Sequence, residues 1–170
     1  AAARAHARQA VLPLLRPGAT HAPHHVPREW ADKYRGQFDQ GWDRVREETF
    51  QRQKELGVIP QDARLTPRPE GIPAWDEMPP ELKPVLARQM EVYAGFLEYA
   101  DYHFGRLIDA LERLEVLENT IVFYLLGDNG ASAESTVYGC FNELPVLING
   151  LRELETPEFL ASKIDEFGGP

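Results

Sequence analysis

The clearest periodic pattern in the chain is a run of apolar residues at helical spacing between positions 84 and 114. The apolar positions recur three and four residues apart, which places them on one face of a helix. The members of this stripe are Leu86, Met90, Tyr93, Leu97, Phe104, Leu107, Leu111 and Leu114. We therefore expect a long helix over residues 84–114 with this stripe buried. Beside the stripe, Asp101 is expected at its polar edge and Gly105 at a close contact with another helix.

A continuous apolar run follows the predicted helix. Residues 120–126 read Thr-Ile-Val-Phe-Tyr-Leu-Leu, a mixture of β-branched, aromatic and aliphatic side chains without polar alternation. Such a run is typical of a central strand that is buried on both faces of its sheet. A long helix followed by a buried strand indicates a crossover unit in an α/β sheet.

Two shorter helices are predicted on either side of this unit. Residues 43–56 show helical periodicity that ends at Gly57, and residues 157–167 follow Thr156, a residue type that favours the N-cap. Many prolines between residues 60 and 80 exclude a long regular element there. We expect an ordered connection over the surface, held in place by packing of Trp75.

Composition and charge narrow the classes of protein that remain. The 170 residues are 43% hydrophobic and 26% charged, as in soluble globular domains. The net charge of -9 argues against broad contact with nucleic acid or anionic lipid. No apolar run reaches the length of about 20 residues that spans a bilayer. The sequence does not distinguish a bacterial cytoplasmic from a periplasmic location. Residues 1–16 form an atypical Ala/Arg-rich start that we leave unassigned.

The predicted strand ends in a short polar segment that can face a site. Residues 127–130 read Gly-Asp-Asn-Gly, and ligands of open α/β sheets bind beyond the carboxyl ends of the strands. The side-chain oxygens of Asp128 and Asn129 suit Ca²⁺ or Mg²⁺ better than zinc. Two ligands do not complete such a site, and an ordinary Asp-Asn-Gly turn explains the same four residues.

A second group of candidate residues is the histidine loop, residues 20–27. It carries His21, His24 and His25 together with two prolines. An imidazole titrates near neutral pH, so a proline-braced histidine can give a proton to a departing alkoxide. The alternatives are a zinc site, which the lack of neighbouring cysteines and carboxylates disfavours, and a solvent-exposed loop without a role. Cys140, the chain's one cysteine, is interpreted as a small residue near a turn.

These motifs occur together in an order that resembles the middle of bacterial-type arylsulfatases. The matching segments are residues 17–27, 34–38, 41–43, 53–60, 90–95 and 128–134. The first reads Pro-Gly-Ala-Thr-His-Ala-Pro-His-His-Val-Pro and the last reads Asp-Asn-Gly-Ala-Ser-Ala-Glu. The likeness extends from residue 17 to residue 170, and the joint spacing is far more specific than either motif alone.

The resemblance implies an α/β fold of the alkaline-phosphatase type, with the long helix packed on a mainly parallel sheet. Residues 17–170 then form a partial sulfatase catalytic domain that acts on a small-molecule sulfate ester. Arylsulfatases use a formylglycine nucleophile and one divalent ion, usually Ca²⁺. By position, Asp128 and Asn129 resemble two metal ligands, and His21 resembles the histidine that contacts the ester and assists departure of the alcohol. No role transfers to His24, His25 or Cys140, and the oligomeric state stays open.

The chain also departs from the arylsulfatase pattern. The formylglycine motif, Cys or Ser followed by x-Pro-x-Arg, is absent, because Cys140 is followed by Phe-Asn-Glu-Leu. The paired early aspartates of the metal shell and the sulfate-binding lysines are missing as well. We therefore expect a central fragment of a sulfatase that has no activity by itself. A phosphoesterase of the same superfamily and a non-catalytic sulfatase-derived fragment are the competing interpretations.

Overall fold

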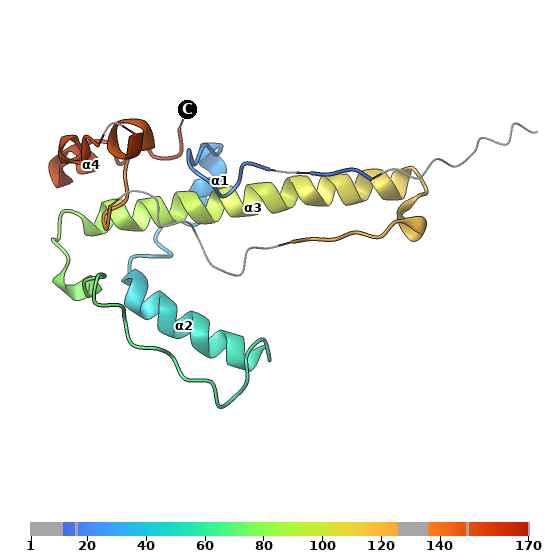
Figure 1. Ribbon diagram of the computed structural model, residues 1–170, viewed down its shortest axis with the longest axis horizontal. Helices are drawn as coiled ribbons and strands as arrows, with labels where there is room; N and C mark the ends of the chain where they lie inside the picture. The colour runs from blue at the N-terminus through green and yellow to red at the C-terminus, as the bar shows by residue number, and fades with distance from the viewer. Residues whose placement is uncertain (1–11, 16, 126–135, 149, 170) are drawn as a thin grey trace, which may run out of the picture.

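The computed structural model describes residues 12–15, 17–125, 136–148 and 150–169. Its α-helices are α1 (Arg28–Asp32), α2 (Gly41–Glu55), α3 (Lys83–Arg113) and α4 (Pro157–Ser162). Shorter helical turns lie at η1 (Trp75–Glu77), η2 (Leu117–Asn119), η3 (Leu144–Ile148) and η4 (Arg152–Leu154). Helix α3 forms the long axis, and α1, α2 and α4 lie toward its N-terminal half (Figure 1).

The long helix confirms the prediction for residues 84–114 to within one residue at each end. Pro84 stands in its first turn, where a proline costs no hydrogen bond because the first N–H groups of a helix have no partner inside it. The helix ends at Arg113, and Glu115 then takes a positive φ of 58°. The start of the helix is therefore explained by the local sequence.

The buried face of α3 is not the predicted apolar stripe, so the prediction that the stripe is buried is wrong. The residues of α3 that are buried are Val85, Ala87, Arg88, Glu91, Val92 and Gly95. Within the stripe, Met90 and Leu97 are 40% and 46% exposed. Burial depends on which element packs against a helix, and here α1 covers the neighbouring face.

A glycine sets the distance between α1 and α3, but it is not the predicted one. A Cβ at Gly95 would lie 2.7 Å from the Cα atom of Ala31, whereas a Cβ at Gly105 would meet nothing within 4 Å. Gly95 thus permits the close approach of α1, and Gly105 lies on an open side of the helix. Around this contact Val26, Ala31 and Val92 form a buried cluster, with Trp30, Phe96, Tyr99 and Phe167 packed against it.

The expected buried strand over residues 120–126 is not confirmed. Ile121, Phe123 and Leu125 are 82%, 78% and 89% exposed, and the described residues contain no strand. Residues 121–125 run beside α3, where the ring centroids of Tyr124 and Phe104 are 4.5 Å apart (Figure 1). A strand requires neighbouring strands to satisfy its backbone N–H and C=O groups, and the described part of the chain offers none. The mainly parallel sheet is therefore not seen in these residues.

The remaining local predictions mostly hold. Helix α2 confirms the helix over residues 43–56, and Trp75 is buried with Met78 and Leu82 in a second cluster, against which Trp42 and Leu86 pack. The Thr156 hydroxyl accepts a hydrogen bond from the Phe159 N–H at 3.2 Å, as an N-cap does. Helix α4 is shorter than predicted, since its last residue is Ser162. No helix in the described ranges is long and apolar enough to cross a bilayer.

Candidate functional site

A cavity of about 920 Å³ lies between the histidine loop, α2, η1 and the first half of α3. Residues 137–144 and 166–169 complete its wall. All three histidines of the loop line this cavity, together with Cys140 and the stripe residues Leu86, Met90 and Tyr93. The part of the apolar stripe that α1 leaves uncovered therefore faces a hollow large enough for an organic ligand.

His21 occupies the outer part of this wall. Its Nδ1 atom lies 2.6 Å from the Ala22 carbonyl oxygen, to which it can donate in the tautomer protonated at Nδ1. The backbone N–H of His21 donates to the Gly18 carbonyl oxygen at 2.8 Å. The side chain is exposed, so a ligand in the cavity can reach its ring.

His24, to which the sequence assigned no role, is held against α3 by several contacts. Its Nε2 atom lies 3.0 Å from the Thr20 carbonyl oxygen, and its ring stands edge-on to the rings of Tyr93 and Phe96. The Thr20 hydroxyl donates to the Tyr93 hydroxyl at 3.1 Å. These contacts attach the start of the histidine loop to α3.

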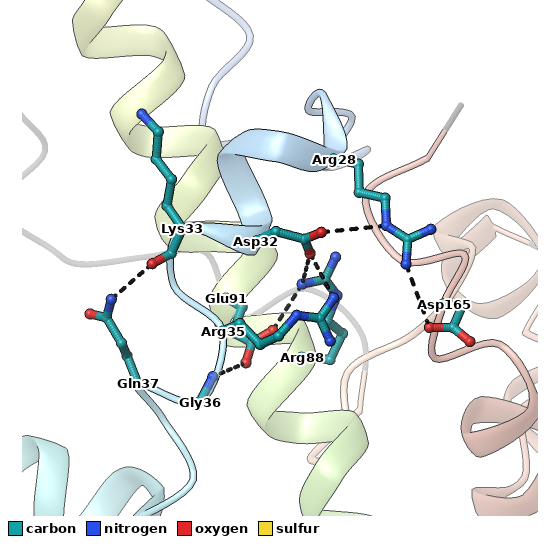
Figure 2. Close-up of polar contacts among 9 residues, drawn as sticks. All are labelled: Arg28, Asp32, Lys33, Arg35, Gly36, Gln37, Arg88, Glu91 and Asp165. Atoms are coloured by element: carbon teal, nitrogen blue, oxygen red, sulfur yellow. Dashed lines mark hydrogen bonds and ion pairs between the residues drawn. The ribbon is translucent and has the colours of Figure 1, made fainter.

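Helix α1 begins directly after the histidine loop, and buried charges hold α1 on α3 (Figure 2). The C-terminal end of the loop is thereby attached to α3. The guanidinium of Arg88 lies 3.0 Å from Asp32 on α1 and 2.9 Å from Glu91 on its own helix. Glu91 in turn accepts a hydrogen bond from the Gly36 N–H at 2.8 Å. Arg88 and Glu91 are buried, and their charges are paired rather than isolated.

Asp32 is the centre of this charged cluster. Besides Arg88, it pairs with Arg35 at 2.9 Å and with Arg28 at 3.5 Å, and Arg28 reaches Asp165 at 3.9 Å (Figure 2). Burial by itself raises the pKa of Asp32, but the charges of Arg88 and Arg35 and their hydrogen bonds lower it by more. The net result is a lowered pKa, so Asp32 is ionised at neutral pH and holds α1 in place.

The opposite wall is formed by the aromatic side chains of Trp42 and Trp75, and Gly41 leaves the space that the Trp75 indole occupies. A Cβ at Gly41 would overlap the indole of Trp75, and Gly41 has a φ of 78°. The ring centroids of Trp75 and Trp42 are 4.9 Å apart in an edge-to-face arrangement. The carboxylate of Asp43 accepts a hydrogen bond from the Trp75 N–H at 2.8 Å, which together with Arg68 lowers the pKa of Asp43. Trp75 is thereby held against the start of α2.

The third wall is the segment around Cys140. The Gln89 side chain on α3 donates to the Tyr138 carbonyl oxygen at 3.2 Å. The Glu155 carboxylate accepts hydrogen bonds from the backbone N–H groups of Phe141 and Asn142 at 2.6 and 2.9 Å. The Gln89 bond attaches the segment to the first turns of α3, and the Glu155 bonds attach it to the residues before α4.

The predicted metal ligands are not tested by this geometry. Asp128 and Asn129 lie outside the described residues, so their position relative to His21 stays a prediction. Within the described ranges no three His, Cys, Asp or Glu side chains gather closely enough to hold a metal ion.

Sequence reasoning missed most of the cavity wall. Trp42, Tyr93 and Phe141 line it, yet none was selected as a functional residue. Trp75 was expected only as a packing anchor. The sequence carried no signal for these residues as a group, because they come from separate segments that meet only in the fold.

Comparison with known proteins agrees with the resemblance drawn from the motifs. The family described as Sulfatase matches residues 9–163. An uncharacterized sulfatase of Schizosaccharomyces pombe is 42% identical over 125 residues, which are 72% of this chain and 22% of that protein. An arylsulfatase of Klebsiella aerogenes is 33% identical over 130 residues, which are 76% of this chain and 28% of that protein.

The chain thus spans roughly a quarter of the length of these curated relatives. The family match covers most of the chain and includes the histidine loop, α2, α3 and the segment around Cys140. Two relatives carry the same family name, one from a yeast and one from a bacterium. This protein therefore belongs to the sulfatase family.

Proposed function

We propose that this chain is part of a sulfuric ester hydrolase that cleaves sulfate monoesters to inorganic sulfate and an alcohol. The observation that carries this proposal is the family match over residues 9–163. The relative from Klebsiella aerogenes is named an arylsulfatase, which supports hydrolysis of an aromatic ester. The cavity beside the histidine loop supplies a place for the organic part of the substrate.

His21 is proposed to assist departure of the alcohol. Cleavage of the ester leaves a negative charge on the alcohol oxygen, and a nearby imidazolium lowers the barrier by giving that oxygen a proton. The exposed position of His21 at the cavity wall supports this role.

The metal and the nucleophile belong to the proposal as well. Asp128 and Asn129 are proposed as two oxygen ligands of a divalent ion, with Ca²⁺ the expected metal. Such an ion stabilises the negative charge of the sulfate oxygens when it is bound. The formylglycine motif is absent from this chain, so the proposed nucleophile belongs to an intact enzyme and not to these 170 residues.

A chimera tests the proposed function. The matching 130 residues of the Klebsiella arylsulfatase are replaced by the corresponding residues of this chain, and release of a phenol from an aryl sulfate is measured. Turnover that is abolished by Asp128→Ala supports the proposal. A chimera that unfolds cooperatively on heating but has no turnover contradicts it, as does turnover that Asp128→Ala leaves unchanged.

The isolated chain tests the second part of the proposal. Because it lacks the nucleophile motif, the purified 170-residue protein should release no phenol above background and should bind Ca²⁺ weakly. Both quantities can be measured directly, by absorbance and by calorimetry. Measured turnover by the chain alone would show that our assignment of the missing parts is wrong.

A further inference from the structure

The phenol hydroxyl of Tyr93 ties the histidine loop to the middle of α3. It accepts a hydrogen bond from the Thr20 hydroxyl at 3.1 Å, although the two residues are 73 positions apart in the sequence. We infer that this hydrogen bond places His21 for its proton transfer, so that Tyr93 is a positioning residue of the site. This role rests on the proposed function, because it requires His21 to act on the leaving oxygen.

Tyr93 is a fixed point because the part of α3 that carries it is packed. Glu91 and Val92 directly before it are buried, and Gly95 two residues later is buried against α1. The Tyr93 side chain is half-buried and lies at the cavity wall. A group on a packed helix is held more precisely than a group on a loop. The hydroxyl of Tyr93 therefore gives the loop a defined place to bind.

Thr20 transmits this position to His21 through one peptide bond. The peptide unit is planar and consecutive Cα atoms stand about 3.8 Å apart, so a fixed Thr20 limits where the Cα atom of His21 can lie. The His21 ring is exposed, and its Nδ1 atom lies 2.6 Å from the Ala22 carbonyl oxygen. The orientation of the ring therefore depends on the backbone of the loop.

His24 also contacts Thr20, but its effect differs from that of Tyr93. Its Nε2 atom lies 3.0 Å from the Thr20 carbonyl oxygen, and this contact joins two residues of the same loop. Such a contact fixes the shape of the loop and moves with it. The Tyr93 hydroxyl comes from α3, so it fixes where the loop stands. Removing that hydroxyl leaves the edge-on packing of His24 on the rings of Tyr93 and Phe96 in place.

The place of His21 matters because proton transfer acts over a short range. As sulfur bonds to the incoming nucleophile, its bond to the alcohol oxygen breaks and the electron pair stays on that oxygen. The imidazolium of His21 then gives this oxygen a proton and becomes neutral. A general acid must lie within about 2.6–3.2 Å of the atom that it protonates, and a displacement of about 1 Å can lower the rate roughly 100-fold.

Tyr93→Phe in the chimera tests the inference, because it removes the hydroxyl and keeps the ring. The substrates are phenyl sulfate and 4-nitrophenyl sulfate. Phenol is the weaker acid and the poorer leaving group, so its departure depends more on the proton from His21. We expect kcat to fall by about tenfold or more for phenyl sulfate and by less than about threefold for 4-nitrophenyl sulfate, with little change in KM. A general loss of structure would lower both rates by the same factor.

Variants of Thr20 test the other end of the same hydrogen bond. Thr20→Val should reproduce the difference between the two esters, and the double variant with Tyr93→Phe should be no slower than either single variant. Thr20→Ser keeps the hydroxyl and should keep kcat for phenyl sulfate within about threefold of the unsubstituted chimera. Tyr99→Phe is the matched control, since Tyr99 lies on α3 outside the cavity wall and packs on Trp30. It should leave both rates within about twofold.

Three results in the chimera would overturn the inference. Equal losses for the two esters, or losses that add in the double variant, would show a structural effect that does not act through His21. A higher KM with unchanged kcat would show that the Tyr93 hydroxyl contacts the substrate itself.

Backbone relaxation in the 170-residue chain tests the positioning without catalysis. The His21 amide should have an order parameter of about 0.85, and Tyr93→Phe should lower it toward about 0.6. The amide of Trp30, which lies in α1, should be unchanged. An order parameter of His21 that is the same in both proteins would overturn the inference.

The chimera also separates the failure of this inference from the failure of the proposed function. A folded, unsubstituted chimera without turnover contradicts the proposed function and the role of His21 with it. If the chimera turns over, and His21→Ala slows phenyl sulfate more than 4-nitrophenyl sulfate while Tyr93→Phe does not, the proposed function stands and Tyr93 does not position His21.

Discussion

The Cα atom of Gly95 in α3 lies directly against the backbone of Ala31 in α1. A Cβ added at Gly95 would stand 2.7 Å from the Cα and N atoms of Ala31, which are backbone atoms that cannot rotate away. This contact brings α1 onto α3 immediately after the histidine loop. The position of the loop on α3 therefore depends on a residue with no side chain.

Gly95→Ala should destabilise the chain even though alanine favours helices. Overpacking of a tight contact costs about 1–3 kcal/mol, more than the gain of roughly 1 kcal/mol from replacing glycine in a helix. Gly105→Ala is the matched control in the same helix, where a Cβ meets nothing within 4 Å. We expect stabilisation there, measured by urea unfolding, and stabilisation at both positions would contradict the packing of α1 on α3.

Arg88→Met should lower the free energy of unfolding by about 3 kcal/mol or more, because it leaves the charges of Asp32 and Glu91 without their buried partner. Arg44→Met provides the control. Arg44 pairs with Glu47 and Glu48 on α2 at 3.5 and 2.9 Å, but its side chain is exposed, so the loss should stay below about 1 kcal/mol. Similar losses in the two variants would show that the Arg88 cluster is not desolvated.

Acid should weaken the attachment of α1. The pKa of Asp32 is lowered on folding, since the charges of Arg88 and Arg35 outweigh the effect of burial. A carboxyl group of this kind stabilises the fold above its unfolded pKa of about 3.9, and the contribution disappears as pH falls through the folded pKa. The difference in unfolding free energy between the wild-type chain and Asp32→Asn should therefore be largest above about pH 5 and shrink toward about pH 2. A difference that is constant with pH would rule out an ionised Asp32 as its source.

Substitution of the histidines in the chimera distinguishes their roles. His21→Ala should lower kcat by about 10²-fold or more if His21 gives the proton to the leaving oxygen. His103→Ala, on α3 outside the cavity wall, should leave kcat near that of the unsubstituted chimera. His24→Ala should chiefly lower the thermal midpoint, because the ring packs on Tyr93 and Phe96. A large loss of kcat for His24→Ala with little change for His21→Ala would assign the proton transfer to His24.

Local sequence was sufficient for α2, α3 and the start of α4, but it did not predict α1. The limits of α3 follow from Pro84 in its first turn and from apolar periodicity over eight turns, and Thr156 starts α4 through its own hydroxyl. These signals act between residues a few positions apart, so they do not depend on the rest of the fold. The family was also readable from the sequence, because the order and spacing of several motifs are shared with arylsulfatases.

Tertiary structure decided which surfaces those helices bury. Gly95 and Gly105 are the same residue type in one helix, yet only Gly95 meets another backbone. The apolar stripe and residues 121–125 remain exposed in part or whole because burial and strand pairing need partners from elsewhere in space. The cavity arises in the same way, from the histidine loop, Trp42, Trp75 and Phe141 brought together over α3. Packing between distant segments has no local signature. For that reason the sequence determined the longer helices and the family, while the wall of the site came only from the fold.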